Sequence, residues 1–247
     1  MKKAVFLFTL ICAVSFGMPS CSASYNSVKR MQKMEEGVSN PTTKEELQEA
    51  IAKFDRRAMD LALTEAQVGI WYKILGTRYL DEQMYGKALE CFRKAVITYP
   101  NNANLYYYIG LCAAYMSHTC LDYNAEGSLE HDQSAKRLNY LRLSEQAYTH
   151  ALEIDPKYYR AMYGIGVLYV FLLGEDSKAI PYLERFVQTQ TRDTNGMFVL
   201  ARAYYSTYEF QKAVDMYDRI ISLNPNPEKV AEAEANKQQV LSLMYNK

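Results

Sequence analysis

The chain has 247 residues, of which 49% are hydrophobic, and its 28 Lys and Arg residues balance 28 Asp and Glu residues. This composition is typical of a globular chain large enough for one or two domains. Zero net charge without a Lys- or Arg-rich tract excludes the electrostatic footprint of a nucleic-acid-binding protein, and only 11 Gly and 7 Pro residues exclude a collagen-like or disordered chain.

Residues 1–20 form the first predicted element, an export signal. Lys2 and Lys3 precede an apolar run from Ala4 to Phe16, which ends at the helix-breaking sequence Gly-Met-Pro-Ser. The apolar run has 13 residues, whereas a membrane-spanning helix needs about 20. We therefore expect a cleaved peptide rather than a permanent membrane segment.

Cys21 follows this signal directly and precedes a small polar sequence, Ser-Ala-Ser. The arrangement resembles the N-terminus of a bacterial lipoprotein, in which such a Cys receives lipid and becomes the mature N-terminus. The resemblance implies that Cys21 is lipidated and holds the protein at an envelope membrane facing the periplasm. Met18 and Pro19 depart from the usual lipoprotein pattern, so ordinary cleavage after Ala23 is the alternative.

Two further elements precede the main part of the chain. Residues 21–42 are polar and predict a flexible tether. Residues 43–66 predict an N-terminal helix or a degenerate half-repeat, because Thr43 and Glu46 have the spacing of a capping box. Apolar residues then recur every three or four positions, as a packing helix requires: Leu47, Ala50, Ile51, Phe54, Ala58 and Leu61.

A pattern with a period of about 34 residues fills most of the remaining chain. Its first copy reads Tyr72-x2-Leu75-Gly76-x2-Tyr79, then Ala88-x3-Phe92-x2-Ala95, then Pro100. Large and small residues alternate on one face, so that paired helices can approach closely. The copies span residues 69–102, 103–158, 159–193 and 194–227, and the second contains an insertion at about 117–137.

This pattern resembles the tetratricopeptide repeat (TPR) family. The resemblance implies an all-α fold, a right-handed α-solenoid of about four helix hairpins whose first helices line a concave surface that binds peptides or protein segments. It implies no cofactor. The polar segment 228–247 is expected to cap the array, with four apolar residues on its inner side: Val230, Ala233, Val240 and Leu243.

One face of the first helices is unusually aromatic in the second to fourth copies. The residues just past each signature position lie at i, i+4, i+7 and i+8, beside the packing face. In the first copy they are ordinary, but the later copies read Tyr107, Leu111, Ala114, Tyr115; then Tyr163, Val167, Val170, Phe171; then Phe198, Arg202, Tyr205, Ser206. We call this set the aromatic stripe. An aromatic face that is not needed for packing indicates a binding site for an apolar segment or ligand.

The candidate partner-binding residues are Tyr107, Tyr115, Arg160, Tyr163, Phe171, Phe198, Arg202 and Tyr205. The alternative is that the insertion, or a tight superhelix, covers the stripe. The two arginines either steer an acidic group or form ion pairs at the surface. TPR co-chaperones grip a C-terminal carboxylate with Lys, Asn and Arg on this face, and the Tyr, Leu and Val residues here exclude that mode.

The insertion partly matches a calcium-binding loop, with candidate ligands Asp122, Asn124, Glu126 and Glu130. Gln133 stands where a bidentate Glu normally completes the shell, which lowers charge and affinity. We therefore predict a solvated acidic loop and no tight metal site.

No catalytic motif stands out: the sequence has no G-x-S-x-G, no phosphate-binding Gly loop and no H-E-x-x-H. Cys91 and Cys112 fall in apolar helical stripes and are expected to be small buried hydrophobes. The sequence thus predicts a non-catalytic, lipid-anchored scaffold that binds a protein or peptide. The alternative function is an accessory lipoprotein that binds an apolar small molecule for periplasmic solute transport. A closed pocket beneath the stripe would favour this alternative, and an open groove would favour a peptide.

Overall fold

The structure is a computed structural model that describes residues 43–119 and 130–245, and it divides into two compact units, Met1–Asp60 and Leu61–Lys247. Every regular element in the described ranges is helical, which confirms the predicted all-α fold. None of the helices in those ranges has both the length and the apolarity needed to cross a bilayer. The predicted signal, Cys21 and the tether lie outside the described residues.

In the first unit, the described residues form the start of helix α2 (Lys44–Asp81). The capping box is confirmed: the Glu46 amide donates to Thr43 Oγ1, and the Thr43 amide donates to Glu46 Oε2, both at 3.2 Å. Leu47 and Ile51 are exposed, so the expectation that they pack is wrong for this unit. The described part of the unit is a single helix, which offers no neighbour to bury them against.

Within the second unit, helix α2 is continuous across the boundary expected between residues 66 and 69. Gly69 does not end the helix. A Cβ atom at Gly69 would lie 2.8 Å from Thr98 Cβ, so this glycine permits a close approach of the next helix.

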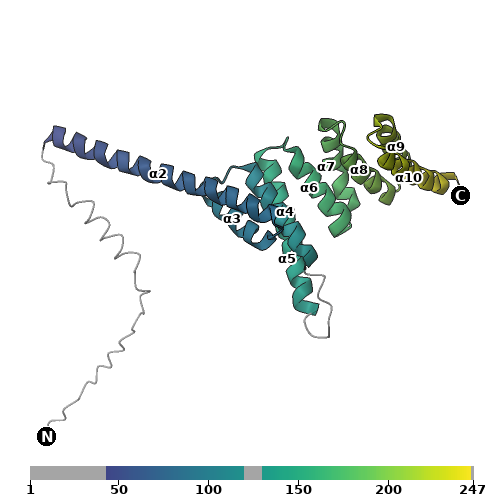
Figure 1. Cartoon of the computed structure of the whole chain (residues 1–247), viewed down its shortest axis with the longest axis horizontal. Coiled ribbons are helices and arrows are strands. Elements are labelled where there is room, and N and C mark those ends of the chain that lie inside the picture. Colours follow the sequence, from purple (N-terminus) through teal and green to yellow (C-terminus); the bar gives the residue numbers. More distant parts are fainter. Residues whose placement is uncertain (1–42, 120–129, 246–247) are drawn as a thin grey trace, which may run out of the picture. The chain divides into compact units, whose positions relative to one another are not determined.

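The second unit is a row of helix pairs (Figure 1). The α2 residues 61–81 pair with α3 (Tyr85–Thr98), and α4 (Ala103–Thr119) pairs with α5 (Glu130–Ile154). Helix α6 (Tyr159–Val167) continues as the π-helix η1 (Leu168–Leu173) and pairs with α7 (Asp176–Thr189), while α8 (Thr194–Ser206) pairs with α9 (Phe210–Leu223). Helix α10 (Pro227–Tyr245) packs on α9. These pairs are the four predicted hairpins and the predicted cap.

In the first three copies, the signature glycine sets the distance between paired helices. A Cβ at Gly76 or Gly110 would lie 2.8 Å from the ring of Phe92 or Tyr148 in the second helix of the same pair. At Gly166 it would lie 2.4 Å from Leu183 Cδ2. The large residue of the second helix therefore packs directly on the backbone of the first, as the alternation of large and small residues predicts.

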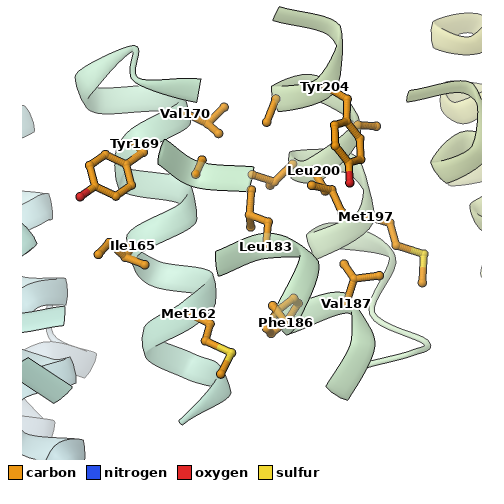
Figure 2. Close-up of a cluster of buried hydrophobic side chains, with 14 of the residues drawn as sticks. Met162, Ile165, Tyr169, Val170, Leu183, Phe186, Val187, Met197, Leu200 and Tyr204 are labelled. Atoms are coloured by element: carbon orange, nitrogen blue, oxygen red, sulfur yellow. The ribbon is translucent and has the colours of Figure 1, made fainter. Parts of the chain in front are cut away.

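The core lies between successive pairs, and Figure 2 shows a part of it where α6, η1, α7 and α8 meet. Ile109 and Leu200 are buried, as expected from their signature positions. Leu75, at the same position of the first pair, is 43% exposed and Tyr72 is only half-buried, so the expectation that both are core residues is wrong. The first pair has no preceding pair in its unit to cover them.

The insertion is partly helical, since α4 extends to Thr119 and α5 begins at Glu130. The calcium-loop candidates Asp122, Asn124 and Glu126 lie outside the described residues, as does the side chain of Glu130. Among the residues that the structure describes, no group of three or more His, Cys, Asp and Glu side chains is placed to hold a metal ion.

The cap differs from expectation at one position. Ala233 and Val240 are buried, whereas Leu243 is exposed and Met244 packs against the core in its place. In an α-helix, the residue four positions after Val240 lies closer to the face of Val240 than the residue three positions after it. This spacing places Met244 on the inner side.

Candidate functional site

The aromatic stripe forms two neighbouring pockets that share Phe171. The Tyr107 pocket, of about 340 Å³, lies between α4, α5, α6 and η1, and the Arg202 pocket, of about 330 Å³, lies between η1, α8, α9 and α10. Seven of the eight predicted partner-binding residues line one or both pockets: Tyr107, Tyr115, Tyr163, Phe171, Phe198, Arg202 and Tyr205. Both pockets are partly open to solvent.

Two rings in the wall of the Tyr107 pocket pack against neighbouring groups. Tyr148 is 1% exposed, and its ring lies against the backbones of both Gly110 and Gly164. Tyr115 stacks on Tyr85 with the ring centres 4.4 Å apart and the planes 6° from parallel. Aromatic pairs of this kind hold side chains in place at little further entropic cost.

Two tyrosines of this pocket, Tyr107 and Tyr163, are neutral at physiological pH. Burial raises the pKa of Tyr107, although Arg160 partly opposes this increase. Burial, followed by the nearby Asp193 carboxylate, raises the pKa of Tyr163. Their hydroxyl groups are therefore polar but uncharged, and a ligand would meet an apolar wall with a few hydrogen-bonding groups.

The Arg202 pocket has a different chemistry. The Arg202 guanidinium lies over the Phe171 ring, 5.1 Å from its centre, and Glu232, Asn236 and Gln239 of α10 line the opposite side. Burial and Glu232 raise the pKa of Tyr217 at this pocket, while Arg202 lowers it. This pocket therefore presents one cation, one carboxylate and two amides beside aromatic rings.

Arg160 is exposed and is not one of the residues that line the pockets. Its guanidinium hydrogen-bonds the Tyr159 hydroxyl, which raises the pKa of Arg160. Among the described residues, neither Arg160 nor Arg202 has a salt-bridge partner, so the predicted alternative of surface ion pairs is not seen there.

The π-helix η1, which carries Phe171, accommodates one extra residue in the third copy. The signature tyrosine and the next signature alanine are nine residues apart in the first and fourth copies, but ten apart from Tyr169 to Ala179. In the fourth copy the Tyr204 carbonyl accepts from the amide five residues later, Glu209, whereas the Tyr169 carbonyl accepts from the amide six residues later, Glu175. A π-helix takes up one extra residue in this way.

In this π-helix, one residue of the aromatic stripe lies elsewhere than predicted. Val170 is buried, although the regular helical spacing predicted it on the stripe beside Phe171. Within the wider turn of η1, Val170 lies in the core and Phe171 is 52% exposed. The ten-residue spacing was the sequence signal that could have revealed this change.

Other contributors to the site were not predicted. Tyr85 supports Tyr115 from α3, and α10 supplies three polar residues to the Arg202 pocket. No sequence signal distinguished the α10 residues, because a polar face on a capping helix also suits solvent.

Comparisons with known proteins agree with this fold. The tetratricopeptide repeat family matches residues 160–189 and 196–227. A TPR repeat-containing protein of Borreliella burgdorferi is 22% identical over 198 residues, which cover 80% of this chain and 78% of that protein.

Three solved structures show the same architecture. The TPR protein TTC0263 of Thermus thermophilus superposes with a TM-score of 0.53 at 16% identity, over 89% of this chain and 96% of that one. MamA superposes with a TM-score of 0.52 at 18% identity, over 78% of this chain and 99% of that one. YrrB, described as a TPR protein with an unusual peptide-binding site, superposes with a TM-score of 0.51 at 17% identity. The match covers 85% of this chain and 88% of that one. The chain therefore contains tetratricopeptide repeats, and its fold is that of a TPR solenoid.

Proposed function

We propose that this chain is a non-catalytic TPR scaffold that binds a protein or peptide segment through the aromatic stripe, at a bacterial envelope membrane to which a lipid on Cys21 attaches it. The observation that carries the proposal is the gathering of ten of the twelve stripe residues around two pockets on either side of Phe171. Proteins built from TPRs typically bind protein or peptide partners, which agrees with this role.

The shape of the pockets favours a peptide over an apolar small molecule. An enclosed apolar cavity would suit a small ligand, because such sites bury most of the ligand surface. The two pockets here are partly open and share one wall. An extended segment could place one side chain in each pocket and cross Phe171 between them. The Tyr107 pocket would take an apolar side chain, and the Arg202 pocket would take a polar or acidic one.

Rigidity would contribute to the affinity. The rings that form the pockets are held by stacking and by backbone contacts, so little side-chain entropy remains to be lost on binding. Aromatic residues in such a setting are typical binding hot spots.

Photo-crosslinking in cells tests the binding proposal. A photoreactive phenylalanine analogue at Phe171 should form adducts with a specific protein, whereas the same analogue at Tyr208, which is 82% exposed but lines neither pocket, should not. Equal adduct patterns from both positions, or no protein adduct at Phe171, would contradict the proposal.

The membrane anchor is tested separately. Cys21→Ser should release the protein from the membrane fraction, because one lipidated residue is proposed to hold it there. A wild-type protein that is soluble and begins at Ser24 would show that the anchor is wrong while leaving the binding proposal intact.

A further inference from the structure

Helix α2 carries an apolar stripe that its contact with α3 leaves exposed. Within the second unit this face exposes Leu61, Val68, Trp71, Ile74 and Leu75, with exposed fractions from 39% at Val68 to 67% at Leu61. We call it the α2 stripe. Large exposed apolar patches on a soluble domain mark interaction sites.

Two members of the α2 stripe, Trp71 and Leu75, occupy positions that are buried in every later copy. Trp71 corresponds to Leu105, Ala161 and Gly196 in the later copies, and all three are buried. Leu75 corresponds to Ile109, Ile165 and Leu200, which are no more than 6% exposed. In those copies the preceding helix pair covers the face. The α2 stripe is therefore shaped to receive another helix.

The spacing of the stripe points to a helical partner. Leu61, Val68 and Leu75 follow one another at seven-residue intervals, with Trp71 three residues after Val68 and four before Leu75. A seven-residue apolar repeat forms a seam along which two helices pack. A membrane surface fits less well, because residues 61–81 carry Lys73 and Arg78 against Glu65 and Asp81 and thus lack the basic excess of membrane-binding helices.

The stripe is also complementary to itself. When two copies lie antiparallel with Val68 on the two-fold axis, Leu61 of each copy faces Leu75 of the other. Trp71, the largest residue, then lies beside Thr64 and Glu65 of the other copy. Such an isologous contact covers both unpartnered faces at once.

We propose that the protein forms a homodimer in which the α2 stripes of two copies pack antiparallel about Val68. This interface lies on a different face from the two pockets, and it does not depend on the proposed function.

Sedimentation velocity of the purified full chain tests the proposal over about 1 to 100 µM, the range in which a micromolar dimer dissociates. Wild type should sediment as a dimer that dissociates on dilution. Val68→Glu places two like charges together at the axis and should weaken association at least about a hundredfold. The matched control is Ile97→Glu, which changes an apolar residue of α3 that is 81% exposed and lies outside the stripe; it should leave the dimer intact.

Two further measurements remain informative if Val68→Glu also perturbs folding. Trp71 is the single tryptophan, so its fluorescence should shift to shorter wavelength, and its quenching by acrylamide should fall, as the dimer forms. The Val68→Cys variant should form a disulfide between two copies under mild oxidation, and mass spectrometry should detect two identical peptides joined at the substituted position.

Four results would overturn the proposal. A monomer at 100 µM with an accessible Trp71 would show that nothing covers the stripe. A monomer with a protected Trp71 would show that another part of the same chain covers it. A monomer whose Trp71 emission shifts only with phosphatidylglycerol vesicles would assign the stripe to the membrane. A dimer that Val68→Glu leaves unchanged would place the interface elsewhere.

Discussion

Phe171 and Leu200 provide the sharpest contrast between a binding residue and a core residue. Leu200 is 2% exposed and lies inside the cluster of Figure 2. Its truncation to alanine should cost about 3 to 5 kcal/mol, because it removes buried methyl groups and leaves a cavity. Phe171 is 52% exposed. Its truncation should forfeit only about half of the 1.5 to 3 kcal/mol of full burial, plus about 0.5 kcal/mol for the cation–π contact with Arg202.

The expected costs are therefore about 1 to 2 kcal/mol for Phe171→Ala and at least about 3 kcal/mol for Leu200→Ala. Urea denaturation followed by far-UV circular dichroism measures both under the same conditions. The denaturant slopes of the two variants should match that of the wild type, so that the midpoints can be compared directly. If Phe171→Ala destabilised the fold as much as Leu200→Ala, Phe171 would be a core residue, and the assignment of the stripe to binding would fail.

Three other predictions concern the scaffold. Deleting Leu172 should give the third copy a nine-residue spacing and convert η1 to α-helix, and the protein should still melt cooperatively. Deleting Ser206 from the regular fourth copy should instead destabilise the protein by several kcal/mol. Equal losses of stability in the two variants would refute the conclusion that η1 takes up one extra residue. Gly166→Ala should lower the free energy of unfolding by about 1 to 3 kcal/mol in urea titrations, because the new Cβ would overlap Leu183; a neutral effect would show that the helix pair can separate freely. Burial raises the pKa of the Cys112 thiol to about 12, so at pH 8 it should remain protonated and resist alkylation until the protein unfolds, as peptide mass spectrometry would report; rapid labelling of the native protein would contradict its burial.

The sequence was most informative where one repeat could be compared with another. The signature positions predicted the helix pairs, the close approach of the paired helices and the burial of Ile109, because each depends on packing that recurs along the array. The same comparison indicated the stripe, of which ten residues line the two pockets.

Prediction failed where a position lacks its usual neighbour or where the period changes. Leu75 has the core signature, but no helix pair precedes it in its unit. Val170 was misplaced because a single extra residue changes the helix type, and a periodicity of 3.6 cannot represent that change. The polar residues that α10 adds to the Arg202 pocket depend on tertiary contact alone.

The central claim is that the aromatic stripe binds a segment of a partner protein, and a titration of that segment tests it most directly. A peptide covering the segment crosslinked at Phe171 would be titrated into the purified protein by calorimetry. Phe171→Ala and Phe198→Ala should each weaken binding about tenfold to nearly a thousandfold, as expected for anchors worth about 1 to 4 kcal/mol, while Tyr208→Ala should leave the affinity unchanged. Equal affinities for all three variants would contradict the claim that this surface is the binding site.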